Sequence, residues 1–134
     1  MKLATWNVNS LNVRLPQVLD WLAANPVDVL ALQETKLTDD KFPADAFAQI
    51  GYNAQWFGQK TYNGVALLTK AALPVSDVVK NIPGFTDDLA RVITATVADE
   101  KLGNIRVVGA YFPNGQEPGS EKFDYKMNWL KGLR

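Results

Sequence analysis

The chain has 134 residues, of which 47% are hydrophobic, with no cysteine, no histidine and a formal net charge of +0. This length and composition suit one globular domain, and they exclude disulfides, zinc–cysteine sites and any histidine general base formed within the chain. No segment reaches the roughly 18 consecutive apolar residues of a membrane span, and the N-terminus lacks the apolar core of a signal peptide, so a cytoplasmic protein without membrane contact is expected.

The N-terminal part of the chain alternates between strand and helix patterns. Apolar residues recur at helical spacing between Leu11 and Leu22, with Asn12 as the predicted N-cap. Asn25-Pro26 is expected to end this helix. The other elements predicted here are strands over Lys2–Asn7 and Val27–Leu32, and a helix over Pro43–Ile50 that is closed by Gly51.

The remainder of the chain is rich in strand patterns. Strands are predicted over Ala54–Phe57, Val65–Thr69, Val75–Val79, Val92–Val97 and Ile105–Tyr111. The segment DEKLGN is typical of a hairpin turn, and PNGQEPGS is expected to be a loop. Ser120 and Glu121 are predicted to open a last helix. This order of elements predicts an α/β fold with a mixed β-sheet.

Polar side chains follow the ends of three predicted strands. They are Asn7 and Asn9 after the first strand, Glu34 after the second, and Tyr111 and Asn114 after the last. Ligands collect at the carboxyl ends of strands in open α/β sheets, so these side chains converge if the three strands share an orientation. A carboxylate beside amide oxygens suits Mg²⁺ or Mn²⁺ rather than zinc. Together with phenol and amide donors for a phosphate, the set indicates metal-assisted phosphoester chemistry.

Each of these residues also has a purely structural interpretation. Glu34 would serve equally well as a surface or helix-capping acid, and asparagines such as Asn7 and Asn9 are common turn formers. The PNG segment is a turn signal in any protein. Tyr111 would equally be an aromatic residue at the edge of the core. Tyr62-Asn63-Gly64 would form a tight turn, and Arg91 would be a solvent-exposed charge at the start of a strand. Spacing alone therefore indicates an α/β domain with a candidate metal site.

Taken together, several segments resemble the exonuclease III family, the bacterial apurinic/apyrimidinic endonuclease branch of the endonuclease–exonuclease–phosphatase superfamily. They are MKLATWNVNSLNVR, PVDVLALQETK, YNGVALLTK, ARVITATV and VVGAYFPNG, in this order. The resemblance extends through SEKFDYKMNWL. It implies half of a four-layer αββα sandwich with a mixed β-sheet. It also implies Mg²⁺- or Mn²⁺-dependent phosphodiester hydrolysis on duplex DNA, at abasic sites or 3′ ends, in base excision repair.

The resemblance implies a role for each candidate residue. Glu34 would bind the divalent metal, and Asn7 would lie in the same metal site and orient phosphate or metal-bound water. Tyr111 and Asn114 would contact the scissile phosphate as catalytic residues. The residues expected to face the DNA backbone are Lys36, Asn63, Gly64 and Arg91. Asn9 is not assigned as a ligand, because some relatives carry an aspartate at that position.

The resemblance is to the N-terminal half of the family only. Family members carry a second α/β half with a G-D-x-N motif and an Asp-His pair, which activate water and stabilise the leaving oxygen. Residues 1–134 match none of this half, so the isolated chain is expected to be inactive. The inner face of its sheet would then expose an apolar patch, which predicts a homodimer, a complex with the missing C-terminal half, or aggregation.

Two alternative functions follow from the same sequence. The first is a catalytically inactive half-domain that self-assembles or needs the C-terminal half. The second keeps the chemistry and changes the substrate, because other superfamily members hydrolyse phosphoinositides or sphingomyelin. The details of YNGVALLTK and YFPNG favour the DNA-repair branch.

Overall fold

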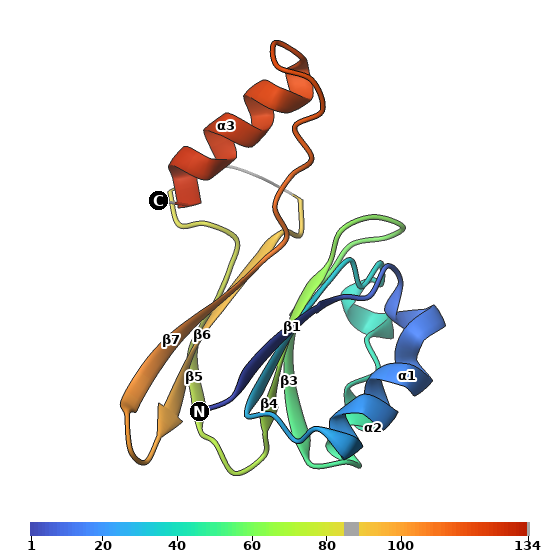
Figure 1. Cartoon of the computed structure of the whole chain (residues 1–134), viewed down its shortest axis with the longest axis vertical. Helices are drawn as coiled ribbons and strands as arrows, with labels where there is room; N and C mark the ends of the chain where they lie inside the picture. Colours follow the sequence, from blue (N-terminus) through green and yellow to red (C-terminus); the bar gives the residue numbers. More distant parts are fainter. Residues whose placement is uncertain (85–88, 134) are drawn as a thin grey trace.

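The computed structural model describes residues 1–84 and 89–133 (Figure 1). Its elements are, in chain order, β1 (Leu3–Asn7), α1 (Leu11–Ala24), β2 (Val29–Gln33), a 3-10 turn (Asp39–Lys41), α2 (Ala44–Ala48), β3 (Tyr52–Phe57), β4 (Val65–Lys70), β5 (Val75–Lys80), β6 (Val92–Asp99), β7 (Gly103–Ala110) and α3 (Glu121–Leu133). Helix and strand thus alternate in the N-terminal part, and strands dominate the remainder, as the sequence predicts.

The strands form two sheets that pack face to face. The first sheet has the order β1-β2-β4-β3 and is mixed, because β1 pairs parallel to β2 while β4 pairs antiparallel to β2 and β3. The second sheet has the order β5-β6-β7 and is antiparallel. The apolar layer between them contains Val29, Val65, Leu67, Ile93, Ala95 and Val97. The predicted α/β fold with a mixed sheet is confirmed, and the antiparallel sheet is an addition to it.

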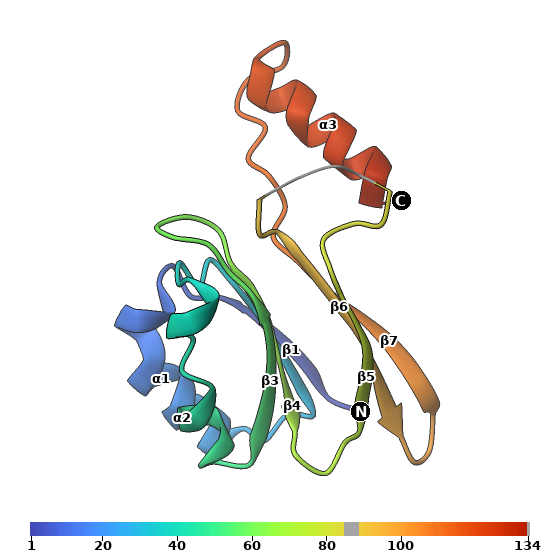
Figure 2. The same cartoon turned by 180° about the vertical axis from the view of Figure 1, so that it is seen from behind.

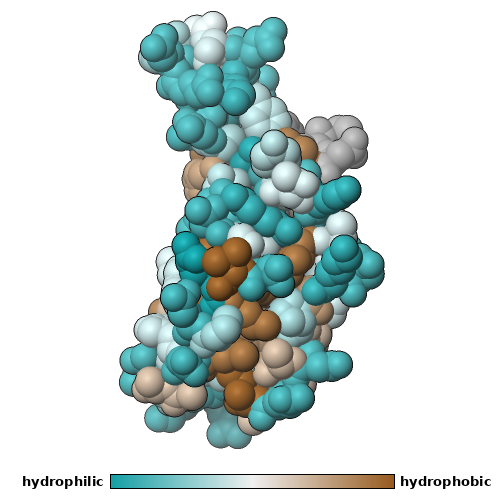
Figure 3. Space-filling model, turned by 90° about the vertical axis from the view of Figure 1, so that its right-hand side faces the viewer, coloured by the Kyte–Doolittle hydropathy of each residue, from teal (hydrophilic) through white to brown (hydrophobic). Residues whose placement is uncertain are grey.

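The two first helices cover the outer face of the first sheet, so the fold is layered as helix, mixed sheet and antiparallel sheet (Figures 1 and 2). Buried Leu11, Val18 and Leu22 of α1 pack with Leu30 and Leu68 of the sheet. Central strand β4 is buried at Val65–Thr69 because it is covered on both faces. The helix layer is polar outside, except for a strip of apolar side chains that reaches the surface (Figure 3).

Helix α1 begins earlier than predicted. Its N-cap is Ser10, not Asn12, and the Ser10 side chain makes no capping hydrogen bond. The backbone N–H of Leu11 donates instead to the carbonyl oxygen of Thr35 at 3.0 Å, and the Leu11 side chain is fully buried. Tertiary contacts therefore decide where this helix starts, which the capping preference of an asparagine could not reveal.

Helix α3 lies beyond the end of the second sheet. The hydroxyl of Ser120 accepts a hydrogen bond from the backbone N–H of Phe123 at 3.1 Å, which confirms Ser120 as the residue that opens this helix. Trp129 is buried against Ile82 and Val92, and its ring meets Phe112 edge-on at 4.9 Å. The helix is thereby fixed near the start of β6 and the end of β7.

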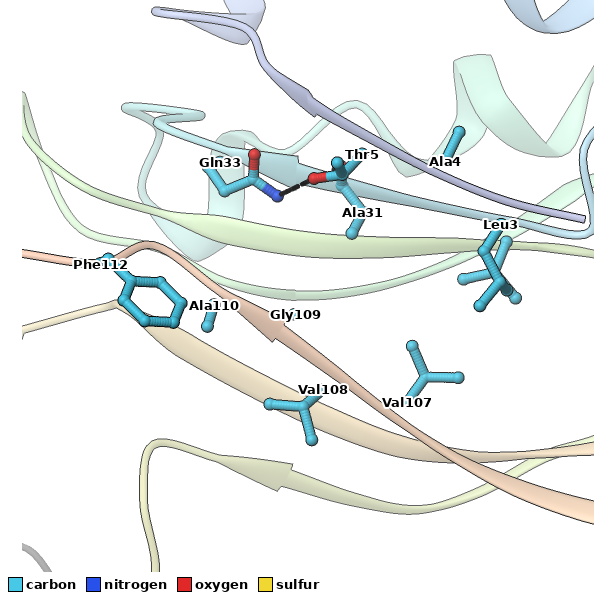
Figure 4. A pocket seen from close by; sticks show the side chains of 11 residues that line it. Leu3, Ala4, Thr5, Ala31, Gln33, Val107, Val108, Gly109, Ala110 and Phe112 are labelled. Carbon is cyan, nitrogen blue, oxygen red and sulfur yellow. Dashed lines mark hydrogen bonds between the residues drawn. The ribbon is translucent and has the colours of Figure 1, made fainter. Parts of the chain in front are cut away.

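The inner face of the first sheet is not left open, contrary to the expectation that it awaits another half of the protein. The chain's own β5, β6 and β7 cover most of it. What stays open is a smaller groove at one side, between β1 and β7 (Figure 4). Within residues 1–84 and 89–133, no helix is long and apolar enough to cross a membrane.

Candidate functional site

The predicted site residues gather at one end of both sheets. β1 and β2 run parallel with Asn7 opposite Gln33, and Gln33 pairs with Val65, so the end of β2 meets the start of β4. In the second sheet Val92 pairs with Ala110, so the start of β6 meets the end of β7. A hydrogen bond of 2.9 Å from the N–H of Gly64 to the carbonyl of Ala90 joins the two ends. The strand orientation on which convergence depended is therefore present.

Glu34 occupies a strained turn directly after β2. Its φ is +57°, and Lys36 has φ +56°, both in the left-handed region that side chains rarely adopt. Three backbone hydrogen bonds hold this turn. The carbonyls of Glu34 and Thr35 accept hydrogen bonds from Ser10 and Leu11 at 2.8 and 3.0 Å, and the N–H of Lys36 donates to the carbonyl of Asn63 at 2.9 Å. The carboxylate is thus presented by a turn that α1 and the start of β4 keep in place.

The loop before β4 approaches the Glu34 turn most closely at Gly64, next to Thr35. A Cβ at this position would lie 2.1 Å from the Thr35 hydroxyl oxygen, and the φ of Gly64 is +97°. Thr35 is buried, and its N–H donates to the Gly64 carbonyl at 3.2 Å. A glycine is therefore needed for the loop before β4 to touch the Glu34 turn. This gives Gly64 a structural function, while its predicted contact with DNA stays a prediction.

The ends of β1 and β2 are linked by polar side chains. The amide oxygen of Asn7 accepts a hydrogen bond from the N–H of Asn9 at 3.1 Å. Asn7 thus forms a turn, which is the structural role that the sequence offered as an alternative to metal binding. The ammonium of Lys36 donates to the amide oxygen of Asn9 at 2.7 Å. Asn7 is exposed, and its amide N–H₂ group and second oxygen lone pair stay available to a ligand.

Tyr111, the residue after β7, lies beside Glu34. Burial raises the pKa of the Tyr111 phenol, and the charge of Glu34 and a hydrogen bond to its carboxylate raise it further, while the Arg91 cation lowers it. Since the pKa moves up from its usual value of 10.0, the phenol is protonated at neutral pH. It is therefore a neutral hydrogen-bond donor next to a carboxylate.

Arg91 is held between two aromatic rings. Its guanidinium carbon lies 5.0 Å from the centroid of Tyr111 and 5.5 Å from that of Tyr125 on α3. One of its terminal nitrogens donates to the Tyr111 carbonyl at 3.4 Å, while its buried Nε has no hydrogen-bond partner among the residues that the structure describes. The cation is thus partly desolvated beside Tyr111, and it is not the freely solvated charge that its place at a strand start would suggest.

Asn114 and Asn63 have different surroundings. Asn114 is exposed, accepts the N–H of Gln116 at 3.0 Å, and lines one groove of ≈ 330 Å³ together with Arg91 and Tyr111. Asn63 is only 8% exposed, and its side-chain amide donates to Gln59 at 3.1 Å. Asn63 therefore stabilises the loop between β3 and β4 through its hydrogen bond to Gln59. Its predicted contact with DNA stays a prediction.

The residues present fit a hard divalent cation in type. Glu34 places a carboxylate at this end of the sheets, with the Tyr111 phenol beside it and the Asn7 amide on the neighbouring strand. Such oxygen donors suit Mg²⁺ better than zinc. Among the described residues, no group of three or more acidic, cysteine or histidine side chains could hold a metal. Mg²⁺ commonly takes one or two carboxylates and fills its other positions with water and substrate phosphates, so one carboxylate is compatible with a partial site.

Two residues of this site were missed from the sequence. The side-chain oxygen of Gln59 accepts from both Asn63 and the N–H of Ala90, at 3.1 and 2.7 Å, and so joins the first sheet to the second. The ring of Tyr125 packs against the guanidinium of Arg91. The sequence gives no local signal for the contact of Gln59 with Ala90 or for that of Tyr125 with Arg91, because each joins residues far apart in the chain.

Comparison with known proteins extends this picture. A sequence profile of the Endonuclease/Exonuclease/phosphatase family matches residues 4–131. Exodeoxyribonuclease III of Haemophilus influenzae is 32% identical over 135 residues, which cover 100% of this chain and 50% of that protein. A 3′ phosphatase from Neisseria, solved bound to a product DNA hairpin, has 49% identity and a TM-score of 0.90, over 99% of this chain and 49% of its own. An AP endonuclease from Archaeoglobus fulgidus has 39% identity and a TM-score of 0.89, over 99% and 49%. The chain spans about half the length of these relatives.

Proposed function

We propose that this chain, which belongs to the endonuclease/exonuclease/phosphatase family, supplies the metal- and phosphate-binding half of a site that hydrolyses phosphodiester bonds in duplex DNA. Membership confirms the resemblance read from the sequence. The proposed substrates are abasic sites and 3′ ends in base excision repair, and the proposed location is the cytoplasm. The observation that supports this function best is the meeting of Glu34, Tyr111 and Arg91 at one end of two sheets.

Each side chain has a proposed part in this chemistry. Glu34, with Asn7 beside it, would hold Mg²⁺ or Mn²⁺, and a bound divalent ion supplies charge stabilisation for the phosphoryl oxygens. The protonated phenol of Tyr111 and the amide of Asn114 would donate hydrogen bonds to the scissile phosphate. Arg91 and Lys36 would attract the DNA backbone through their charge. Asn63 and Gly64 would act through the Glu34 turn that they support, besides any contact with DNA.

The chain alone lacks a group that could activate water by the usual histidine route, since it has no histidine. The alternative proposal is therefore an inactive half-domain that requires a second polypeptide. That second polypeptide would be another copy of this chain in a homodimer or a separate C-terminal half, and a second copy would bring no histidine.

A cleavage assay on a duplex with a single abasic-site analogue tests the proposal. The chain is assayed with Mg²⁺, alone and with the half of the Neisseria 3′ phosphatase that it does not match. We expect no cleavage by the chain alone, and EDTA-sensitive cleavage after the second half is added. Cleavage by the chain alone would overturn the inactive half-domain, and no cleavage in a mixture shown by light scattering to contain the complex would overturn the hydrolytic function.

Lys36 provides a test of DNA binding that needs no catalysis. If its ammonium contacts one phosphate, Lys36→Gln will weaken binding of a fluorescent duplex and lower the slope of log K against log salt by about 0.9. Lys101→Gln is the matched control, because Lys101 is exposed in the β6–β7 hairpin at the opposite end of the sheets. Equal salt slopes for the two variants would argue against contact between Lys36 and DNA.

A further inference from the structure

Two asparagines of the chain are followed directly by glycine, Asn63 by Gly64 and Asn114 by Gly115. An asparagine in such a pair is chemically labile, because glycine has no side chain to hinder the approach of its backbone nitrogen to the preceding side-chain amide. Both pairs belong to the candidate site, one in the loop before β4 and the other in the loop after β7. The structure gives them different surroundings.

Hydrogen bonds hold the first pair on all sides. The N–H of Gly64 donates to the carbonyl of Ala90 at 2.9 Å, so the nitrogen that would attack is engaged between the two sheets. Asn63 is only 8% exposed, and its side-chain nitrogen donates to Gln59 at 3.1 Å. The carbonyl of Asn63 also accepts the N–H of Lys36 at 2.9 Å. A reaction within this pair therefore requires the loop before β4 to open first.

The second pair lacks this protection. Asn114 is exposed, and the N–H of Gly115 donates to no residue that the structure describes. The amide oxygen of Asn114 accepts the N–H of Gln116 at 3.0 Å, which closes a turn around the Gly115 nitrogen. A hydrogen bond to a carbonyl oxygen also polarises its carbon. The attacking nitrogen is thus unengaged, and the polarised carbon that it would attack lies in the same turn.

The packing of α3 gives a reason for glycine at position 115. A Cβ there would lie 3.0 Å from the Cδ of Lys126 and 3.5 Å from the Phe123 ring, so the loop packs closely on the helix. The hydroxyl of Ser120 donates to the Gly115 carbonyl at 3.2 Å and fixes the loop further. The lability of the Asn114-Gly115 pair thus accompanies a glycine that the fold uses.

We propose that Asn114 is a site of spontaneous deamidation, and that its conversion removes a phosphate contact from the candidate site. The backbone nitrogen of Gly115 loses its proton and forms a bond to Cγ of Asn114. The bond from Cγ to the side-chain nitrogen breaks, and ammonia leaves. Water then opens the cyclic imide at either of its two carbonyls, which yields aspartate or isoaspartate at position 114.

The product differs from asparagine in its charge and in its hydrogen bonding. A carboxyl group of ordinary pKa is ionised at neutral pH, and it has no N–H to donate to a phosphate oxygen. Arg91 lines the same groove as Asn114, so the new charge also offsets the attraction of this cation for the DNA backbone. This consequence rests on the proposed function, in which Asn114 contacts the scissile phosphate, whereas the deamidation itself does not.

Peptide mapping by mass spectrometry, during incubation of the folded chain at mildly alkaline pH, tests the reaction. We expect the amide of Asn114 to convert to a carboxyl at least about 10-fold faster than that of Asn63, which must wait for its loop to open. In concentrated urea both should convert at similar rates. Asn114→Gln is the control, because its longer side chain forms the cyclic imide much less readily. Equal rates at Asn63 and Asn114 in the folded chain, or no conversion of Asn114 while the unfolded chain reacts, overturns the proposal.

Asn114→Asp reproduces one product and tests its effect on DNA binding. We expect it to weaken binding of a fluorescent duplex, measured without metal, at least about 10-fold. Asn104→Asp is the matched control, because Asn104 is exposed near the start of β7, at the far end of the second sheet, and it should change binding less than about twofold. Equal binding by the two variants overturns the loss of a phosphate contact. The peptide map involves neither DNA nor cleavage, so failure of the deamidation and failure of the proposed function are distinguishable.

Discussion

Replacement of Glu34 by glutamine is expected to lower the cleavage rate of the reconstituted protein at least about 100-fold. The glutamine keeps the size of the side chain and the oxygen that points into the site, but it removes the carboxylate that the first sheet presents beside Tyr111. A hard divalent cation is held mainly by charge, so an amide is a much weaker ligand. The same substitution should weaken Mn²⁺ binding by the isolated chain, which electron paramagnetic resonance of free Mn²⁺ can follow.

Glu100→Gln is the control for this substitution. Glu100 is exposed in the hairpin between β6 and β7, at the far end of the sheets from Glu34. Both variants change the net charge equally, so a difference between them reflects position rather than general attraction of cations. If Glu34→Gln and Glu100→Gln bind Mn²⁺ alike and cleave alike in the mixture, Glu34 does not hold the metal.

Gly64→Ala is expected to destabilise the chain by about 2–4 kcal/mol in urea unfolding. About 1 kcal/mol comes from placing an alanine at a φ of +97°, and the rest from a methyl group 2.1 Å from the buried Thr35 hydroxyl. To relieve this contact, the loop before β4 must move away from the Glu34 turn. The reconstituted activity should therefore fall as well, although Gly64 has no side chain of its own to offer.

Gly103→Ala separates the two causes. Gly103 has a φ of +77°, close to that of Gly64, but a Cβ there would meet no atom of the described residues within 4 Å. This variant should lose only the conformational part, about 1 kcal/mol. Equal losses for Gly64→Ala and Gly103→Ala would show that the contact with Thr35 does not constrain the turn.

Much of the fold could be predicted because its signals are local. The apolar spacing from Leu11 to Leu22 and the run over Val27–Leu32 appear as α1 and β2, with ends shifted by a few residues. The predicted start of α1 is wrong, because the backbone hydrogen bond from Leu11 to Thr35 decides where the helix begins. The chemistry of the candidate site was also local in part, because Glu34 and Tyr111 each stand where a strand ends.

The sequence by itself determined the element types, the mixed sheet and the identity of the polar residues at the strand ends. Only the tertiary structure decided that β5–β7 form a separate sheet, that Gln59 joins the two sheets, and that Tyr125 stacks on Arg91. The reason is physical. Side-chain periodicity reports which face of an element is buried, whereas strand pairing and contacts between distant residues depend on which surfaces meet after folding.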